Sequence, residues 1–294
     1  MKYRIAGIGE LLWDMFPGGN ELGGAPANFA YHVKSLGGEG IVVSSVGDDK
    51  QGKEILDRFR SLSLTTEYIS LDKEHPTGTT SVSVDAEGKP SYIIHENVAW
   101  DFIPRTLQLA RLAGTVDAVC FGCLGQRSGV SRDTIRWFLG KTHTEALRVF
   151  DATLRQSFFS SEMIEASLQV ANVLKLNEEE LQKLAELLAL DGDELTLIEN
   201  IAGRYHLRLV SLTRGEKGSI LYSEGETSVH PGYRVRVVDT VGAGDSFAAA
   251  LVLGMLMGKR LDVINEAANR LASFVCSRRG ATPELPDALR RIYQ

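Results

Sequence analysis

The stretch Asp239-Thr-Val-Gly-Ala-Gly-Asp-Ser-Phe247 joins a glycine-rich turn to the start of a long apolar segment. Its small residues Gly242, Ala243 and Gly244 would let a polyanion approach the backbone, where amides at a helix N-terminus favour negative charge. A carboxylate among these donors repels a resting phosphate, so Asp245 indicates chemistry on a neighbouring hydroxyl. Alternatively, Asp245 only caps the helix. The stretch predicts phosphoryl transfer to an alcohol.

Strand-like and amphipathic segments alternate along most of the remaining sequence. This alternation predicts a doubly wound, mostly parallel α/β sheet flanked by helices, with ligands at the carboxyl ends of its strands. The expected strands cover 3–8, 40–46, 118–122, 147–152, 173–176 and 207–212, and helical patterns cover 26–36, 52–61, 132–142 and 178–188.

Two regions break this alternation. Residues 11–16, and 79–84 with 91–95 around a turn at 87–90, have strand-like sequences with no helix between them. We expect a small β-sheet that acts as a lid over a substrate, although an ordinary edge hairpin has the same pattern. No linker stands out, which favours a single domain over 1–294 with a lid formed by about 11–23 and 77–98.

The composition narrows the class of protein. The chain has 294 residues, is 44% hydrophobic, and carries 32 Lys and Arg against 38 Asp and Glu, for a net charge of -6. Without a basic run, nucleic-acid and membrane partners are disfavoured, and a small-molecule substrate is favoured. The N-terminus lacks the apolar core of a signal peptide, so we expect a cytoplasmic location. The Cys120 and Cys123 pair is interpreted as two reduced thiols.

Neither standard nucleotide-binding motif is present. The segment from Gly47 to Glu54 has P-loop spacing, but Glu54 replaces the Ser or Thr that would hold magnesium, and Asp48 and Asp49 would repel phosphate. We interpret it as a strand-to-helix turn.

A second glycine-rich segment suits a neutral polyol. The segment Gly23-Gly-Ala-Pro-Ala-Asn28 opens a helical pattern and offers backbone amides and the Asn28 amide. A purely structural Gly-Gly turn is the alternative. Asp14 lies in an apolar context, where a carboxylate needs a bonding partner, and a sugar with adjacent hydroxyls would supply one.

Three further signals follow strands in the second half. Arg155 has the planar fork that suits phosphate oxygens. Asn177 and Glu180 offer an amide and a carboxylate for hydrated Mg²⁺. Helix capping explains Asn177 equally well, and an acidic first turn, to which Glu180 belongs, complements the helix dipole. The turn from Thr213 to Gly218 would admit a nucleotide or simply join two strands of a hairpin.

The two glycine-rich stretches, from Gly23 to Asn28 and from Asp239 to Asp245, resemble the two signatures of the ribokinase-type (PfkB) carbohydrate kinases. The resemblance spans nearly the whole chain, with Gly37, Gly47 and the terminal Arg278-Arg-Gly-Ala-Thr-Pro283 also in the family's order. Within the family, the stretches around Asp14 and from Tyr92 to Asn97 are most similar to bacterial fructokinases.

The resemblance implies transfer of the ATP γ-phosphate to a sugar hydroxyl, for fructose the one on C6, with Mg²⁺ and often a monovalent cation such as K⁺. Asp245 would be the base, the amides of Gly242, Ala243 and Gly244 would stabilise the phosphates, and Arg155 would reach the transferring group. The remaining implied residues are Asp14, Gly23, Gly24, Asn28 and Asn97 for the sugar; Asn177, Thr213, Gly215, Lys217 and Asn269 for the nucleotide; Asn177 and Glu180 for Mg²⁺; and Asp239, Val241 and Gly280 for the monovalent cation.

Two positions depart from the family pattern. Thr153 stands where relatives often carry Asn, and Glu284 stands where some carry a small polar cation ligand. The same chemistry on ribose, 2-keto-3-deoxygluconate or a nucleoside is the alternative to fructose, and a catalytically silent sugar sensor is a second one. A homodimer through the lid is expected, because an open sheet edge tends to be covered.

Overall fold

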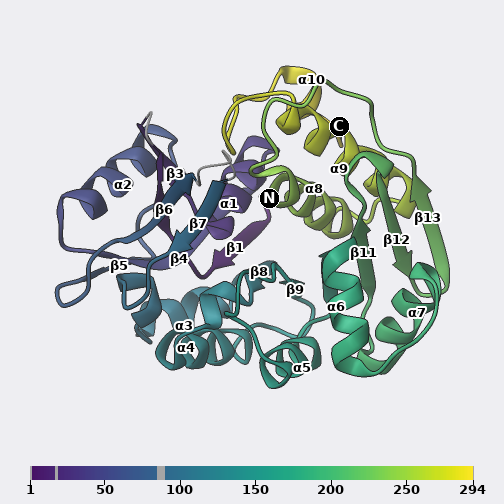
Figure 1. Cartoon of the computed structure of the whole chain (residues 1–294), viewed down its shortest axis with the longest axis horizontal. Helices are drawn as coiled ribbons and strands as arrows, with labels where there is room; N and C mark the ends of the chain where they lie inside the picture. Colours follow the sequence, from purple (N-terminus) through teal and green to yellow (C-terminus); the bar gives the residue numbers. More distant parts are fainter. Residues whose placement is uncertain (1, 17–18, 85–89, 294) are drawn as a thin grey trace.

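A central sheet with helices on both faces forms the body of the computed structural model, which describes residues 2–16, 19–84 and 90–293 (Figure 1). Its strand order is β13-β12-β11-β10-β9-β8-β1-β4-β5, and only the β11–β12 and β12–β13 pairs are antiparallel. The predicted doubly wound, mostly parallel fold is confirmed. The strands are β1 (Arg4–Ile8), β4 (Glu39–Gly47), β5 (Ile69–Asp72), β8 (Ala118–Gly122), β9 (Leu147–Asp151), β10 (Val173–Asn177), β11 (Leu209–Thr213), β12 (Ser219–Ser223) and β13 (Glu226–His230).

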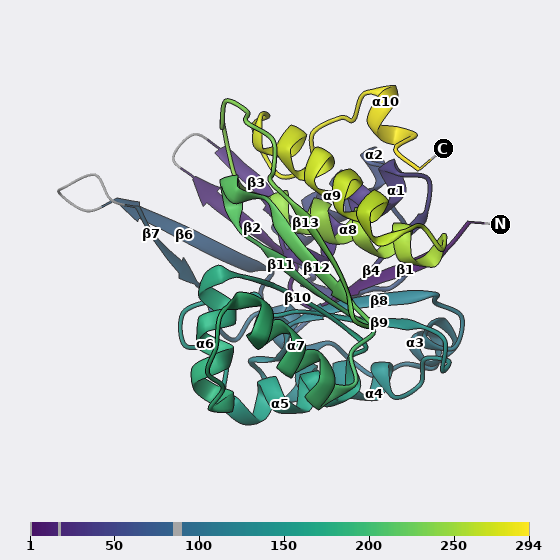
Figure 2. The same ribbon diagram turned by 90° about the vertical axis from the view of Figure 1, so that its right-hand side faces the viewer.

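Two layers of helices bury the two faces of this sheet (Figure 2). One layer contains α3 (Leu107–Ala113), α4 (Gly129–Leu139), α5 (Ser161–Val170), α6 (Glu178–Leu188) and α7 (Glu194–Tyr205). The other contains α1 (Ala25–Ser35), α8 (Ala243–Leu256), α9 (Leu261–Cys276) and the short α10 (Asp287–Arg290). Short 3-10 turns are η1 (Ala99–Phe102), η2 (Leu124–Gln126) and η3 (Gly215–Lys217).

Helix α8 lies in the middle of its layer and is apolar on all sides. Its residues from Ser246 to Gly254 are buried, and its neighbours are α1 and α9. A helix without a polar face is stable only inside the protein, because every side chain then leaves water. The sequence that follows Asp245 therefore fixes this helix in the interior.

A second, four-stranded sheet projects from the body (Figure 2). Its order is β3-β2-β6-β7, with β2 (Leu12–Phe16) parallel to β6 (Gly78–Val84), and with β3 (Gly19–Gly23) and β7 (Pro90–Ile94) antiparallel at the edges. Residues 87–89 of the expected turn lie outside the described residues. The three predicted strands are present, and β3 is an additional one.

The segment with P-loop spacing is a strand-to-helix turn, as predicted. It joins β4 to α2 (Lys50–Ser61), and the Asp49 carboxylate accepts a hydrogen bond from the Gly52 amide at 2.7 Å. The carboxylate that would repel a phosphate thus caps the helix. Among the described residues, no helix is both long and apolar enough to cross a membrane.

Candidate active site

The N-terminal turn of α8 begins at a glycine that no other residue could replace without strain. Gly242 has φ of 77°, and a Cβ atom there would lie 2.6 Å from the carbonyl oxygen of Ala281. The Ala243 amide donates to the Thr240 carbonyl at 3.3 Å, whereas first-turn amides generally have no partner within their helix. The amides of Gly244 and Asp245 are therefore the ones best placed to bind an anion.

Asp245 lies in this first turn and meets the second glycine-rich segment. Its Oδ2 accepts a hydrogen bond from Nδ2 of Asn28 on α1 at 2.9 Å. Burial raises the pKa of Asp245 to about 6, and the nearby Asp151 adds to this, against the lowering effects of Asn28, Lys175 and Arg155. A carboxylate with this pKa is ionised at neutral pH and is a better proton acceptor than an exposed one.

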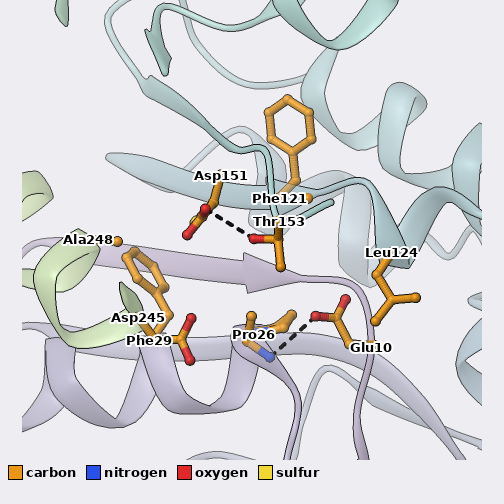
Figure 3. A pocket seen from close by; sticks show the side chains of 12 residues that line it. Glu10, Pro26, Phe29, Phe121, Leu124, Asp151, Thr153, Asp245 and Ala248 are labelled. Atoms are coloured by element: carbon orange, nitrogen blue, oxygen red, sulfur yellow. Dashed lines mark hydrogen bonds between the residues drawn. The ribbon is translucent and has the colours of Figure 1, made fainter. Parts of the chain in front are cut away.

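A cavity lies between Asp245 and the ends of the central strands (Figure 3). Glu10, Asp151 and Thr153 line it together with Asp245. Burial raises the pKa of Glu10 to about 7, and its Oε1 accepts a hydrogen bond from the Ala25 amide at 3.3 Å. Sequence reasoning missed Glu10, although its place directly after a buried strand was a usable signal.

Below the turn of α8 lies a buried ion pair that sequence reasoning also missed. Nζ of Lys175 donates to both oxygens of Asp151, at 2.9 and 2.8 Å. A Cβ atom on Gly244 would lie 3.2 Å from this Nζ, so the cation is directly beside the turn. Although burial alone would lower the pKa of Lys175, Asp151 and Glu180 raise it above its ordinary value. A lysine within an apolar strand was the signal for this pair.

The predicted sugar-binding residues lie where α1 meets the small sheet. Gly24 caps the N-terminus of α1 with φ of 110°, and a Cβ atom on Gly23 would overlap the Asp14 carboxylate. Burial raises the pKa of Asp14, whose Oδ1 accepts a hydrogen bond from Thr80 at 2.6 Å. Asn97 follows β7 and is exposed.

The hydroxyl of Thr153 forms a hydrogen bond to another side chain of the protein. It donates to Oδ1 of Asp151 at 3.0 Å, and the backbone at Thr153 has φ of 38°. Thr153 is thus part of the same polar cluster as the buried ion pair.

Arg155, Asn177 and Glu180 line a second cavity of about 200 Å³. Asn177 and Glu180 form a capping box: the Asn177 side chain accepts from the Glu180 amide at 2.8 Å, and Glu180 accepts from the Asn177 amide at 2.9 Å. The other oxygen of Glu180 accepts from the Leu154 amide at 3.1 Å. The helix-capping alternative is therefore present in the structure. Among the described residues, no cluster of three or more His, Cys, Asp or Glu side chains has a geometry suited to a metal ion.

The predicted nucleotide residues surround the end of β11. Thr213 lies opposite Asn177 in the parallel register, and the turn that follows joins β11 to β12 as a hairpin. Nζ of Lys217 contacts Glu178 at 2.8 Å, and Gly215 has φ of 55°. Asn269 on α9 is more internal than predicted, because its Nδ2 donates to Ser219 and to Asn265.

The three residues implied for a monovalent cation lie together. The carboxylate of Asp239 accepts hydrogen bonds from the Val241 amide at 3.0 Å and from the Gly280 amide at 3.1 Å. Glu284, the position that departs from the family pattern, pairs with Arg290 at 2.7 Å.

Cys120 and Cys123 are free buried thiols, and burial raises the pKa of both.

Comparison with known proteins identifies the family. Residues 14–288 match the model of the pfkB family carbohydrate kinase. The chain belongs to this family. The reaction of this kinase is therefore phosphoryl transfer to a sugar-type acceptor.

The relatives named here cover nearly the whole length of the kinase. An uncharacterized sugar kinase from Pyrococcus horikoshii is 29% identical over 97% of this chain and 94% of its own, and its complex with ATP has a TM-score of 0.82. A fructokinase from Escherichia coli is 26% identical, with 97% of each chain covered. The structure of a putative ribokinase II from Escherichia coli in complex with ATP and Mg²⁺ is 20% identical and has a TM-score of 0.82. The match covers 99% of this chain and 98% of the other.

Proposed function

We propose that the kinase is an ATP-dependent fructokinase with Asp245 as its general base. The observation that carries the proposal is the bond between Asp245, in the anion-binding turn, and Asn28, on the helix that begins at the polyol-binding glycines. The O6 proton of the sugar passes to Asp245 while O6 forms a bond to the γ-phosphorus. The bond from that phosphorus to the β,γ-bridging oxygen breaks, and ADP leaves.

The sugar is held by Asn28, Asp14, Gly23, Gly24 and Asn97. Oδ1 of Asn28 is buried without a hydrogen-bond partner among the described residues, and a sugar hydroxyl that donates to it would satisfy it. Asp14 is a partly buried carboxylate that would accept from a second hydroxyl. Two acceptors on neighbouring elements suit a polyol better than an apolar alcohol.

The phosphate end uses the α8 amides and Arg155, and Thr213, Gly215 and Lys217 border the nucleotide. Asn269 lies behind this border, because its Nδ2 is bonded to Ser219 and Asn265. Mg²⁺ would be held by Asn177 and Glu180 through water, because each oxygen of Glu180 already accepts one amide and keeps a second lone pair. Bound Mg²⁺ would neutralise charge on the phosphates. K⁺ would bind at Asp239, Val241 and Gly280.

The small sheet, with residues 11–23 and 77–98, is proposed to act as a lid and as the surface of a homodimer. In the part of the chain that the structure describes, its edge strands β3 and β7 pair with one neighbouring strand each. Unpaired strand edges tend to become covered. A closing sheet would also exclude water from the transferring phosphate.

A coupled ADP-release assay with Mg²⁺ over fructose, ribose, 2-keto-3-deoxygluconate and nucleosides tests the proposal. We expect the highest kcat/KM with fructose, and a loss of at least ~10²-fold in kcat for Asp245→Asn, because the general base is lost. The control is Asp133→Asn, an exposed carboxylate on α4, which should retain activity.

Each part of the proposal has its own failing outcome. Wild-type kcat in Asp245→Asn would remove the base assignment, and a higher kcat/KM on another acceptor would remove fructose alone. Sugar binding without turnover on any acceptor would identify a silent sensor. Equal rates with K⁺ and with tetramethylammonium would exclude cation activation.

A further inference from the structure

One face of α1 contacts both the catalytic carboxylate and the C-terminal segment 280–283. Asn28, Tyr31 and His32 are spaced i, i+3 and i+4, so they share a face of the helix. Asn28 binds Asp245, the Tyr31 hydroxyl donates to the carbonyl of Pro283 at 3.1 Å, and Nε2 of His32 lies 2.9 Å from the carbonyl oxygen of Ala281. The three contacts join residues 217, 252 and 249 positions apart in the sequence.

The segment that Tyr31 and His32 hold is the one that supports the turn of α8. A Cβ atom on Gly242 would lie within 2.7 Å of three atoms of Ala281, so the backbones of the two segments are in direct contact. The adjacent Gly280 amide donates to Asp239 at 3.1 Å. A displacement of Ala281 would therefore move the turn that carries the anion-binding amides.

His32 places a polar side chain in the protein interior, which lowers the stability of the fold relative to an apolar residue. It is completely buried, and its Nδ1 has no hydrogen-bond partner among the described residues. Since a carbonyl can only accept, Nε2 carries the proton and Nδ1 is left as an unsatisfied acceptor, which costs free energy that an apolar side chain would not. Filling space does not explain the imidazole, whereas orienting the Ala281 carbonyl does.

We propose that Tyr31 and His32 are positioning residues that fix the α8 turn relative to α1, and thereby the phosphate-binding amides relative to the acceptor sugar. Neither residue touches the reacting atoms. The inference rests on the proposed function of the α8 turn. It states that two hydrogen bonds from α1 set the distance between the phosphate-binding turn of α8 and the sugar-binding end of α1. A misplacement of about 1 Å between reacting groups is enough to lower a rate by ~10²-fold.

The test compares three tyrosine and histidine variants with a matched control. Tyr31→Phe and His32→Leu each remove one hydrogen bond to segment 280–283, and His32→Gln restores a donor. The control is Tyr293→Phe, because the Tyr293 hydroxyl donates at 2.7 Å to the carbonyl of Ala250 in the middle of α8. It removes the same kind of tyrosine hydroxyl–carbonyl bond, but one that reaches the middle of α8, away from the turn and from segment 280–283.

We expect Tyr31→Phe and His32→Leu to lower kcat by ~10-fold with the KM for the sugar changed less than about twofold, which corresponds to the loss of one positioning interaction. His32→Gln should recover most of this loss, and Tyr293→Phe should keep wild-type kcat. Equal kcat in Tyr31→Phe and Tyr293→Phe would overturn the proposal. A raised sugar KM at unchanged kcat would also overturn it.

Amide hydrogen exchange provides a readout that does not depend on turnover. In Tyr31→Phe and His32→Leu, peptides covering 239–246 and 278–283 should exchange faster than in the wild type, and Tyr293→Phe should leave them unchanged. Unchanged exchange in Tyr31→Phe, which removes a single oxygen and keeps the ring, would refute the inference even if His32→Leu does not fold. If the wild type shows no turnover but the variants still show faster exchange in these peptides, the proposed function fails and the positioning role is supported.

Discussion

Asp245, the proposed general base, shows how burial changes the proton affinity of a common side chain. Its pKa is raised to about 6, first by burial and then by Asp151, while Asn28 limits the rise through a hydrogen bond to the charged form. The group therefore stays ionised at neutral pH but accepts a proton more readily than an exposed aspartate does. The same partner that positions the base also sets its proton affinity.

The pH dependence of the reaction should report this group. In the proposed mechanism only the ionised Asp245 carboxylate accepts the hydroxyl proton, so kcat/KM should fall as the pH decreases through about 6. Asn28→Ala removes a bond that lowers the pKa of Asp245, and the acidic limb should then move to higher pH. Measurement of kcat/KM from pH 5 to pH 8 checks both, and a limb that does not move in Asn28→Ala contradicts the coupling.

His32 should make the stability of the fold sensitive to acid. Burial lowers its pKa from 6.5 to about 4, so between these values the unfolded chain binds a proton that the folded chain does not. The free energy of unfolding should fall by about 3 kcal/mol as the pH decreases from 6.5 to 4.

Urea unfolding at pH 7 and at pH 4.5 measures this contribution. The loss on acidification should be smaller in His32→Gln than in the wild type, because glutamine does not titrate. His143→Gln, at an exposed histidine, is the control and should show the wild-type loss. An equal loss in all three proteins would show that His32 is not the group responsible.

At the scale of elements, the pair between Lys175 on β10 and Asp151 on β9 connects two central strands below the α8 turn. Removing one partner leaves a buried charge without compensation. Lys175→Met should therefore destabilise the fold by about 3 kcal/mol or more, and Asp151→Asn with Lys175→Met should cost less than the sum of the single variants. Thermal and urea unfolding of the wild type, the two single variants and the double variant measure these free energies. Additive losses of stability would exclude a coupled pair.

The elements themselves were largely predictable. The helix expected at 178–188 has those bounds in the structure, because an acidic first turn and an apolar periodicity are both local properties. Strand β3 was not predicted, since Gly19 and Gly23 at its ends give little strand preference and only pairing with β2 orders it.

The side-chain partners were less accessible to sequence reasoning. The Lys175 and Asp151 pair depends on which strands are neighbours, and the contact of His32 with Ala281 joins positions 249 apart. Asn177 shows the reverse case, because the helix-capping alternative to its Mg²⁺ role rested on local sequence, and the structure contains a capping box of Asn177 and Glu180. Local sequence patterns identified individual polar residues, whereas the order of the strands determines which of these residues contact one another.

At the scale of the whole molecule, the parallel sheet gathers groups from distant parts of the chain. Asp151, Asn177 and Thr213 each end a strand, so all three lie at one edge of the sheet. The small sheet projects beside this edge and presents Ile93 on its outermost strand with about half of its surface exposed. Such a side chain suits contact with a second copy.

A dimer through the small sheet should be visible by sedimentation at micromolar protein. Ile93→Asp should shift the kinase to monomers, because a charge on a contact face is costly to bury. Leu107→Asp is the control, since Leu107 on α3 is 81% exposed and lies outside the small sheet. A wild-type monomer, or dissociation by both variants alike, contradicts this interface.

The enclosure of α8 has a consequence for how this enzyme can diverge. Substitutions along that helix would disturb its packing against α1 and α9 at the same time. Few sequences are therefore compatible with the helix that carries the proposed phosphate-binding turn. Among the described strands, the edge strands of the small sheet have neighbours on one side. Under selection for a new acceptor, accepted mutations should accumulate in the small sheet, and the inherited chemistry should pass unchanged from one sugar preference to the next.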